Sequence, residues 1–243
     1  MLWRNSITGK SDKVIVPSDY LREEAVINGI AAEKIAVLPL FTKKNPKGVY
    51  TKPEKNTILF VGRLDPLKGI YEFLKSLSLI SGVKWKVYII GMGEGMITYV
   101  KMAEDLGIRD RIEFLTNLDY SDLDEYYKKA FAVVFPSINP ESFGLVGIEA
   151  MSFGRPVVAF DSGGPRDWLV NNETGFLVKR GDIRGLADRI SQLLGDESLS
   201  TDMGRNGMER VERLYRKDMH IKQLIKIYEE VIRKRSGTWR KGL

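Results

Sequence analysis

Short apolar runs without a polar interruption recur along the middle of the chain, as in "TILFVG" and "FAVVFP". Such a run is typical of a parallel strand covered on both faces, because a strand with one wet face would alternate apolar and polar residues. The pattern predicts strands over Thr57–Gly62, Lys86–Ile90, Arg111–Leu115, Ala132–Phe135 and Pro156–Phe160, with Gly175–Val178 as a further candidate.

Between these runs lie segments whose apolar residues recur at helical spacing. They predict helices over Gly69–Ile80, Glu94–Leu106, Ser121–Lys129, Gly144–Phe153 and Arg166–Val170, followed by Ile183–Leu194, Ser198–Leu214 and Asp218–Lys234. Strands that alternate with helices indicate an α/β protein with a doubly wound, Rossmann-like parallel sheet. Ligands of such sheets bind at the carboxyl ends of the strands, so the loops that follow the strands are the candidates for chemistry.

A smaller unit precedes this alternation. Two apolar runs, Lys13–Pro17 and Lys34–Leu40, flank a helical segment, Asp19–Asn28, which Gly29 ends. The polar stretch "FTKKNPKGVYTKPEKN", with its prolines and glycine, then has the composition of a linker. We expect a first unit over residues 1–45, a linker over 46–56, a main domain over 57–217 and a terminal helix with a basic tail over 218–243.

The amino-acid composition excludes several kinds of functional site. The 243 residues include no cysteine and a single histidine, His220, which excludes disulfides, thiolate metal sites and histidine clusters within this chain. The absence of cysteine favours a reducing, cytoplasmic location. No apolar run is long enough to span a membrane. His220 is far in sequence from the strand-end loops, so we expect it to be structural.

The C-terminal end of the chain is basic and amphipathic. Residues 205–243 hold 12 lysines and arginines against 5 acidic residues, within a net charge of +6. This surplus suits an anionic lipid surface or nucleic acid, and it equally suits a solvated helix face. We expect peripheral membrane contact and no nucleic-acid partner. The last helix carries an apolar stripe that needs either the first 40 residues or another chain against it: Ile221, Leu224, Ile225, Tyr228, Val231 and Ile232.

Two loops could hold a diphosphate. In "GRLDPLKG", Gly62 permits a tight turn, Arg63 offers a planar guanidinium to phosphate oxygens, and Lys68 adds a point charge. A turn with two surface cations explains this motif equally well. The second loop, "IIGMGEG", supplies Gly91 and Gly93 but lacks the full dinucleotide-binding fingerprint, and the need for a close turn explains its glycines.

The stretch "PESFGLVGIEAMSFGRPV" contains two carboxylates, Glu141 and Glu149. We expect its helix to begin near Phe143–Gly144, with Ser142 as the N-cap. The N–H groups of residues 143–145 are then free to bind phosphate or sugar hydroxyls. Glu149 lies about 7.5 Å beyond Gly144 along the helix. One carboxylate can therefore hold one polyol and the other a second, with an anion between them, which is the shape of a nucleotide sugar.

The alternative is that Glu141 is only a charge at a helix N-terminus and Glu149 a surface residue. The neighbours "GLVGIEAM" indicate a mostly buried helix, and a buried carboxylate without a partner is costly, so we favour a functional role for Glu149. A fourth loop, "DSGGPRDW", follows the next strand and forms either a tight turn or a floor for the sugar.

Together these loops resemble the family 4 (group 1) glycosyltransferases of the GT-B fold. The resemblance is carried, in the family's order and spacing over residues 57–195, by "GRLDPLKG", "GMGEG", "FPSINPESFGLVGIEAMSFGRPVVA", "DSGGPRD" and "NNETGFLV". The two glutamates match the family's E-x7-E motif. A GT-B enzyme has two Rossmann-like domains, and this chain resembles the C-terminal, donor-binding one. The segment "SDKVIVPSDYLREEAVINGIAAEKIAVLPL" resembles the end of the N-terminal, acceptor-binding domain, most of which is missing, and "LFTKK" replaces the family's Asn-Gly turn.

The resemblance implies a role for each candidate residue. Arg63 and Lys68 would hold the donor diphosphate and stabilise the leaving nucleoside diphosphate, and Glu141 would contact hydroxyls of the transferred sugar. Glu149 would hold the ribose. The remaining donor contacts would come from the loop glycines, the start of the helix and the backbone beside the base: Gly62, Gly91, Gly93, Leu115, Leu118, Ser142, Phe143, Gly144 and Leu145. The family works with retention at the anomeric carbon and requires no metal or cofactor.

We therefore expect a transferase that moves a hexose-type sugar from a nucleoside diphosphate sugar to a glycan or lipid-linked acceptor, in the cytoplasm or peripherally at the membrane. One alternative is a nucleotide-sugar-binding subunit that is inactive until a partner chain supplies the acceptor domain. Another is a decayed fragment that serves only as a scaffold, against which the intact donor loops argue.

Overall fold

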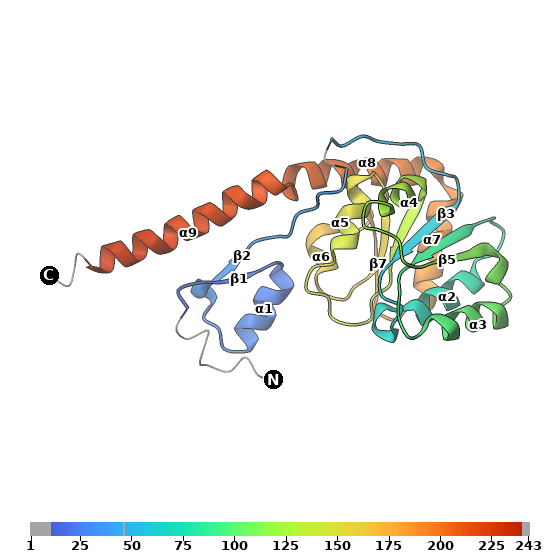
Figure 1. Ribbon diagram of the computed structural model, residues 1–243, viewed down its shortest axis with the longest axis horizontal. Coiled ribbons are helices and arrows are strands. Elements are labelled where there is room, and N and C mark those ends of the chain that lie inside the picture. Colours follow the sequence, from blue (N-terminus) through green and yellow to red (C-terminus); the bar gives the residue numbers. More distant parts are fainter. Residues whose placement is uncertain (1–10, 46, 240–243) are drawn as a thin grey trace.

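The structure, a computed structural model, describes residues 11–45 and 47–239 (Figure 1). Six parallel strands form one sheet in the order β5-β4-β3-β6-β7-β8. They are β3 (Thr57–Val61), β4 (Lys86–Ile90), β5 (Ile112–Leu115), β6 (Ala132–Phe135), β7 (Val157–Phe160) and β8 (Gly175–Val178). All the strands predicted for the main domain are confirmed, and Gly175–Val178 is one of them.

Helices connect the strands on both sides of the sheet. They are α2 (Ile70–Leu79), α3 (Met96–Asp105), α4 (Leu123–Lys129), α5 (Leu145–Ser152), α6 (Pro165–Trp168), α7 (Ile183–Gly195) and α8 (Glu197–Leu214). Their ends fall within two residues of the predicted ends. The last helix, α9 (Lys217–Trp239), runs further than predicted.

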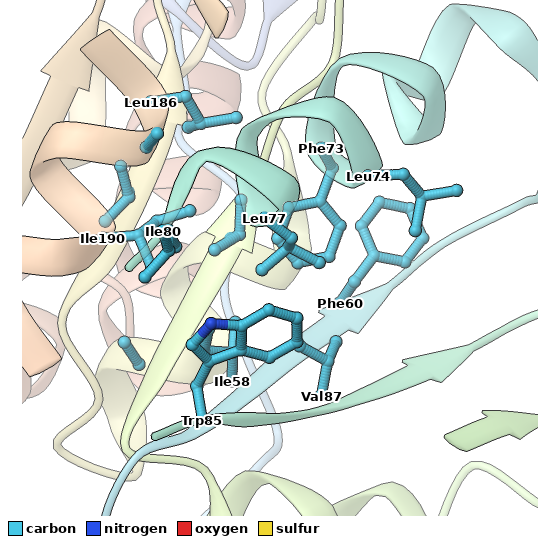
Figure 2. Packing of buried hydrophobic residues seen from close by; sticks show 14 of the residues in the cluster. Ile58, Phe60, Phe73, Leu74, Leu77, Ile80, Trp85, Val87, Leu186 and Ile190 are labelled. Carbon is cyan, nitrogen blue, oxygen red and sulfur yellow. The ribbon is translucent and has the colours of Figure 1, made fainter. Parts of the chain in front are cut away.

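Both faces of the sheet are apolar, as the uninterrupted runs predict. Within β3, Ile58 and Phe60 belong to one buried cluster and Leu59 to the other. Helices α2 and α7 close the first cluster, and Figure 2 shows Phe73 of α2 beside Phe60, with ring centroids 6.1 Å apart. The second cluster is closed by α4, α5 and α6, with Trp168 fully buried. The predicted doubly wound sheet is confirmed.

The order of the strands defines where ligands bind. From β3 the chain moves outward to β4 and β5, and it then returns to the other side of β3 to form β6, β7 and β8. The direction of winding therefore switches between β3 and β6. In open α/β sheets the ligand crevice forms outside the carboxyl ends of the strands at this switch point.

The first unit forms a separate two-stranded parallel sheet with one helix. Its elements are β1 (Val14–Val16), α1 (Asp19–Ile27) and β2 (Ile35–Val37). It contacts the main sheet domain at α6, where the amide N of Asp19 donates to Asp167 Oδ2 at 2.9 Å. The Ser18 hydroxyl donates to the carbonyl of Ser142 at 2.6 Å. These contacts place the small unit beside the loops that follow β6 and β7, while its origin as a domain remnant stays a prediction.

Helix α9 extends away from the sheet domain (Figure 1). Its first turn is held to the chain after β2, where His220 Nδ1 lies 2.7 Å from the Pro39 carbonyl and the ring contacts Phe41, as expected of a structural histidine. Among the described residues, much of the apolar stripe stays exposed: Ile221, Ile225, Tyr228 and Ile232. The described part of the first 40 residues does not cover these four side chains. Within that same part of the chain, none of the helices has the length and apolarity needed to cross a bilayer.

Candidate donor-binding site

The loops at the carboxyl ends of the strands are joined by backbone hydrogen bonds in the order of the sheet. The N–H of Gly91, after β4, donates to the carbonyl of Leu115, at the end of β5, at 3.0 Å. The N–H of Leu64, after β3, donates to the carbonyl of Met92 at 2.8 Å. These bonds hold the "GRLDPLKG" and "GMGEG" loops against each other and against the end of β5.

The same row continues across the switch point. The N–H of Ile138, after β6, donates to the carbonyl of Leu67 at 3.0 Å. The N–H of Glu141 donates to the carbonyl of Ser162, after β7, at 2.7 Å. One continuous rim therefore runs along the sheet edge, and the four loops chosen from the sequence all belong to it.

Two glycines are required by how closely these loops approach. Gly91 has φ of 155°, and a Cβ there would lie 1.8 Å from the carbonyl oxygen of Gly62. A Cβ on Gly164 would lie 2.8 Å from the carbonyl oxygen of Glu141, which accepts the Gly164 N–H at 2.8 Å. The close approach at Gly91 and Gly164 is thus present, and a side chain at either position would push the rim apart.

Lys68 and Glu141 meet at the switch point. The Lys68 ammonium is paired with Glu141 Oε1, and the Ser137 hydroxyl donates to the same oxygen at 2.6 Å. Lys68 comes from the loop after β3 and Glu141 from the loop after β6, so the pair bridges the two strands between which the winding reverses. A cation and a carboxylate side by side can hold a phosphate and a sugar hydroxyl at adjacent positions.

Arg63 lies apart from this pair. Its guanidinium is 3.1 Å from the carboxylate of Asp65, and its side chain is 73% exposed. The structure therefore brings together two of the three predicted catalytic residues, Lys68 and Glu141, and leaves Arg63 on the outer side of the same loop. An exposed arginine can change rotamer at little cost, so it remains available to a bound diphosphate.

The helix after Glu141 starts later than predicted. Helix α5 begins at Leu145, and its N-cap is Gly144, with φ of 91° and no side-chain cap. The prediction that Ser142 caps this helix is wrong. The Ser142 side chain is exposed and its carbonyl is occupied by Ser18, so the chain turns through a left-handed glycine instead.

The backbone N–H groups expected at this helix start are available. Within the described residues, none of the N–H groups of Phe143, Gly144 and Leu145 donates a hydrogen bond. The side chain of Phe143 is fully buried, and the indole N–H of Trp168 donates to its carbonyl at 2.6 Å, which fixes the orientation of this segment. A row of free donors at the positive end of a helix attracts phosphate and sugar oxygens.

Glu149 is inside the protein, so the alternative that it is a surface residue is wrong. It is 5% exposed, and two hydroxyls hold its carboxylate: Tyr120 donates to Oε1 at 2.6 Å and Tyr127 donates to Oε2 at 2.9 Å. Burial, and then the contact with Glu149, raises the pKa of both phenols, so both remain protonated donors. The two hydroxyls offset the cost of burying the carboxylate.

A lysine from the polar stretch before β3 completes this cluster. Lys44 is buried, and its ammonium lies 2.6 Å from Asp124 Oδ1 and 3.6 Å from the centre of the Tyr120 ring. It also donates to the Tyr120 carbonyl. The chain that leaves the small unit thus positions the tyrosine that holds Glu149.

The segment expected to contact the base follows β5. Leu115 and Leu118 pack, partly buried, against the second core cluster, and Asn117 between them has φ of 57°. Their side chains thus face the core, which leaves the backbone of the segment as the part able to contact a ligand.

Sequence reasoning missed several residues of this site. Ser137 holds Glu141, Tyr120 and Tyr127 hold Glu149, and Lys44 holds Tyr120. None of these four was singled out. A buried glutamate must have donors, so hydroxyl partners for Glu149 could have been anticipated in kind. Which residues supply them depends on contacts between distant parts of the chain. Among the described residues, no group of three or more histidine, cysteine or acidic side chains is arranged to hold a metal.

Comparison with known proteins finds a family that matches most of the chain. The model of the family described as "Glycosyl transferases group 1" matches residues 42–210. The chain is 32% identical over 180 residues to the capsular polysaccharide biosynthesis glycosyltransferase CapM of Staphylococcus aureus, covering 73% of this chain and 47% of CapM. It is 35% identical over 183 residues to the D-inositol 3-phosphate glycosyltransferase of Corynebacterium glutamicum (strain R), covering 72% of this chain and 43% of that protein.

Solved structures show the same fold. Sucrose-phosphate synthase from Thermosynechococcus elongatus superimposes with a TM-score of 0.80 at 29% identity, covering 93% of this chain and 59% of that one. HepE of Anabaena, solved with UDP and glucose, superimposes with a TM-score of 0.81 at 22% identity, covering 90% of this chain and 64% of that one. The chain spans about half the length of the curated relatives it matches.

Proposed function

The chain belongs to the group 1 glycosyl transferases, and we propose that it is the donor-binding half of a retaining hexosyltransferase. The donor is a nucleoside diphosphate sugar, and the acceptor is a glycan or a lipid-linked glycan. The observation that carries this proposal is the Lys68–Glu141 pair at the switch point, beside three N–H groups without partners in the described structure. The pair offers a cation for phosphate and a carboxylate for sugar at adjacent positions on the rim.

The donor lies along the rim in the order of the strands. The base contacts the backbone at residues 115–118 after β5, and the ribose hydroxyls bind Glu149. The diphosphate lies by Lys68 and the start of α5, and the sugar contacts Glu141 and the loop after β7. Vicinal hydroxyls suit a carboxylate, because it accepts two hydrogen bonds at once.

The reaction breaks the bond between the anomeric carbon and the diphosphate oxygen and forms a bond from that carbon to the oxygen of an acceptor hydroxyl, whose proton passes to the leaving diphosphate. Negative charge then develops on the leaving nucleoside diphosphate. Lys68 and the free N–H groups at the start of α5 lie beside this charge, and the exposed Arg63 can turn toward it. Groups fixed in advance around a developing charge lower the barrier. The chain thereby supplies the positive charge itself, and we propose that no metal or cofactor is required. Nucleotide affinity should be the same with and without a chelator.

Thermal denaturation in the presence of UDP, GDP and ADP tests the donor site. UDP is the first candidate, because the HepE structure was solved with it. A ligand at 100 times its dissociation constant adds about 2.7 kcal/mol to the free energy of unfolding. We expect this stabilisation with one nucleotide, and its loss in Arg63→Ala, whose exposed side chain can be removed without harm to the fold. Lys101→Ala, on the exposed surface of α3, is the matched control. No stabilisation by any nucleotide would contradict the proposal.

A second candidate function is supported by a different observation. The chain spans about half of its relatives, and the exposed stripe on α9 offers a surface for another domain. A nucleotide-sugar-binding subunit, inactive until another chain supplies the acceptor domain, fits both facts. The basic C-terminal segment would hold either form against an anionic membrane surface.

A further inference from the structure

A pocket opens at the end of the rim that lies beyond Glu141. Its volume is about 540 Å³, and it lies between the ends of β7 and β8 and the first turn of α1. The residues that matter for its chemistry are Tyr20, Pro140, Ser162, Arg166, Lys179 and Arg180. Neither the candidate donor residues nor the proposed reaction uses the cations among them.

The pocket is positively charged. Lys179 and Arg180 follow β8, are exposed and have no acidic partner among the described residues. Arg166 is held by both oxygens of Asp161, at 2.5 and 2.9 Å. Three cations against one carboxylate leave a surplus of two positive charges on the pocket wall. An arginine beside a lysine is a common arrangement for binding phosphate or carboxylate.

A buried hydroxyl in the same wall has no partner. Ser162 is 2% exposed, and its Oγ makes no hydrogen bond with any described residue. Buried polar groups are nearly always paired, so an unpaired hydroxyl in a pocket lining points to a ligand or a water that supplies the partner. This observation is independent of the surface cations.

The position of the pocket indicates which part of the reaction it serves. Along the rim the strands run from β5, by the proposed base, through β3 and β6, by the diphosphate and sugar, to β7 and β8. Pro140, adjacent to Glu141 in the chain, lines the pocket, and the backbone of Glu141 is bonded to Ser162. The pocket therefore begins where the transferred sugar ends, on the side away from the nucleotide.

We propose that this pocket binds a phosphate or carboxylate of the acceptor, next to the hydroxyl that receives the sugar. The inference rests on the proposed donor site, because that site defines which end of the rim the acceptor approaches. Tyr20 comes from α1, so the small unit and the sheet domain would hold the acceptor together. An acidic sugar on the donor would bring the same kind of anionic group to the pocket. The experiment below distinguishes the acceptor from the donor sugar as the ligand.

Titration of the isotope-labelled chain with glucose 6-phosphate and with glucose, followed by NMR, tests the pocket. The two probes differ only in the phosphate. We expect glucose 6-phosphate, and not glucose, to shift the amide signals of residues 162–164 and 179–181. The Lys179→Ala, Arg180→Ala double variant should bind it at least about tenfold more weakly, as the loss of charged hydrogen bonds predicts. Arg205→Ala removes an exposed cation of α8 and should leave the affinity unchanged. Equal shifts with both sugars, or equal losses of affinity in the double variant and in Arg205→Ala, would contradict the proposal that the pocket binds an anion.

Nucleotide binding, measured in the same samples, tests the proposed donor site separately from the anion pocket. The double variant should bind nucleotide as the unaltered chain does. Phosphate-dependent shifts without any nucleotide binding would support the anion pocket and overturn the donor site. With the chain saturated by a nucleotide sugar whose hexose is neutral, glucose 6-phosphate should still bind. Its displacement would overturn the acceptor assignment and give the pocket to the donor sugar.

Discussion

The carboxylate of Glu149 shows how a single residue can be both structural and a ligand-binding candidate. Two tyrosine hydroxyls hold it inside the protein, so its removal leaves two buried donors unpaired. An alanine there would lower stability as well as any affinity, and the two effects would be confused. A useful substitution must keep the hydrogen bonds and remove only the charge.

Glu149→Gln comes nearest to this condition, because its amide oxygen still accepts from one tyrosine hydroxyl and its NH2 group can donate to the other once that hydroxyl rotates. Glutamine keeps one oxygen acceptor and the shape of the side chain, so we expect the fold to persist while nucleotide affinity falls about tenfold or more, because a charged acceptor for the ribose is lost. Isothermal titration with the nucleotide that stabilises the chain measures this. Glu104→Gln, at an exposed position of α3, is the matched control and should change neither the free energy of unfolding nor the affinity. Unaltered affinity in Glu149→Gln would remove this residue from the site.

Asp167 gives a prediction about pH. It receives the Asp19 amide at the contact between the small unit and the sheet domain, and burial raises its pKa above 3.8. Between the unfolded and folded pKa values the native state binds more protons, so this group destabilises the fold as pH rises through that window. Asparagine cannot titrate. The stability of Asp167→Asn relative to the unaltered chain should therefore be greater at about pH 7 than at about pH 3.

Urea denaturation at the two pH values measures this difference. A relative stability of Asp167→Asn that stays flat or falls between the two pH values would show that burial of this carboxyl does not oppose folding.

At the scale of elements, the sequence predicts what local patterns determine. Uninterrupted apolar runs predicted β3 to β8 because both faces of the sheet are covered, and helical spacing predicted α2 to α8. The N-cap of α5 was predicted wrongly, because a serine before a helix is a good cap in general. Here contacts from α1 to Ser142 and from Gly164 to Glu141 decide the path of the chain, and no local pattern reports them.

The polar stretch from residue 41 to 56 is a second case in which long-range contacts decide. Its composition is typical of a linker, and its described residues form no helix or strand. Composition did not predict that Lys44 would be buried against Tyr120 and Asp124, 76 and 80 residues later in the chain. The roles predicted for the candidate donor residues follow from the resemblance, and the structure adds their geometry.

Lys44→Met therefore tests whether the polar stretch before β3 positions the site. Methionine retains most of the volume and removes the ion pair and the cation–π contact, so we expect a loss of about 1–3 kcal/mol in the free energy of unfolding. Nucleotide affinity should fall several-fold, because Tyr120 would no longer be fixed beside Glu149. The neighbouring Lys43 is exposed, and Lys43→Met should change neither quantity. If both substitutions changed stability and affinity equally, this stretch would act only through its positive charge.

At the scale of the whole molecule, the loops of the rim are bonded to one another, while the surfaces beside the rim are exposed. The backbone bonds that join the loops run from β5 to β7 within the described residues, so the proposed donor surface needs no other chain to form. The side facing the small unit is different. There the sheet of β1 and β2 has two strands within the described residues, and the stripe on α9 is exposed.

This asymmetry predicts that binding and turnover separate. We expect the purified 243-residue chain to bind its nucleotide and to transfer no sugar, because the acceptor must be held from the side where this chain supplies only the small unit. A coupled assay for nucleoside diphosphate release, with and without a longer version of the chain, measures transfer. The Lys68→Ala variant of the longer version should lose activity, which ties any turnover to the Lys68–Glu141 pair. Sugar transfer by the 243-residue monomer would show that the small unit already provides a sufficient acceptor surface, and the pocket beside Ser162 would then be the first place to look for it.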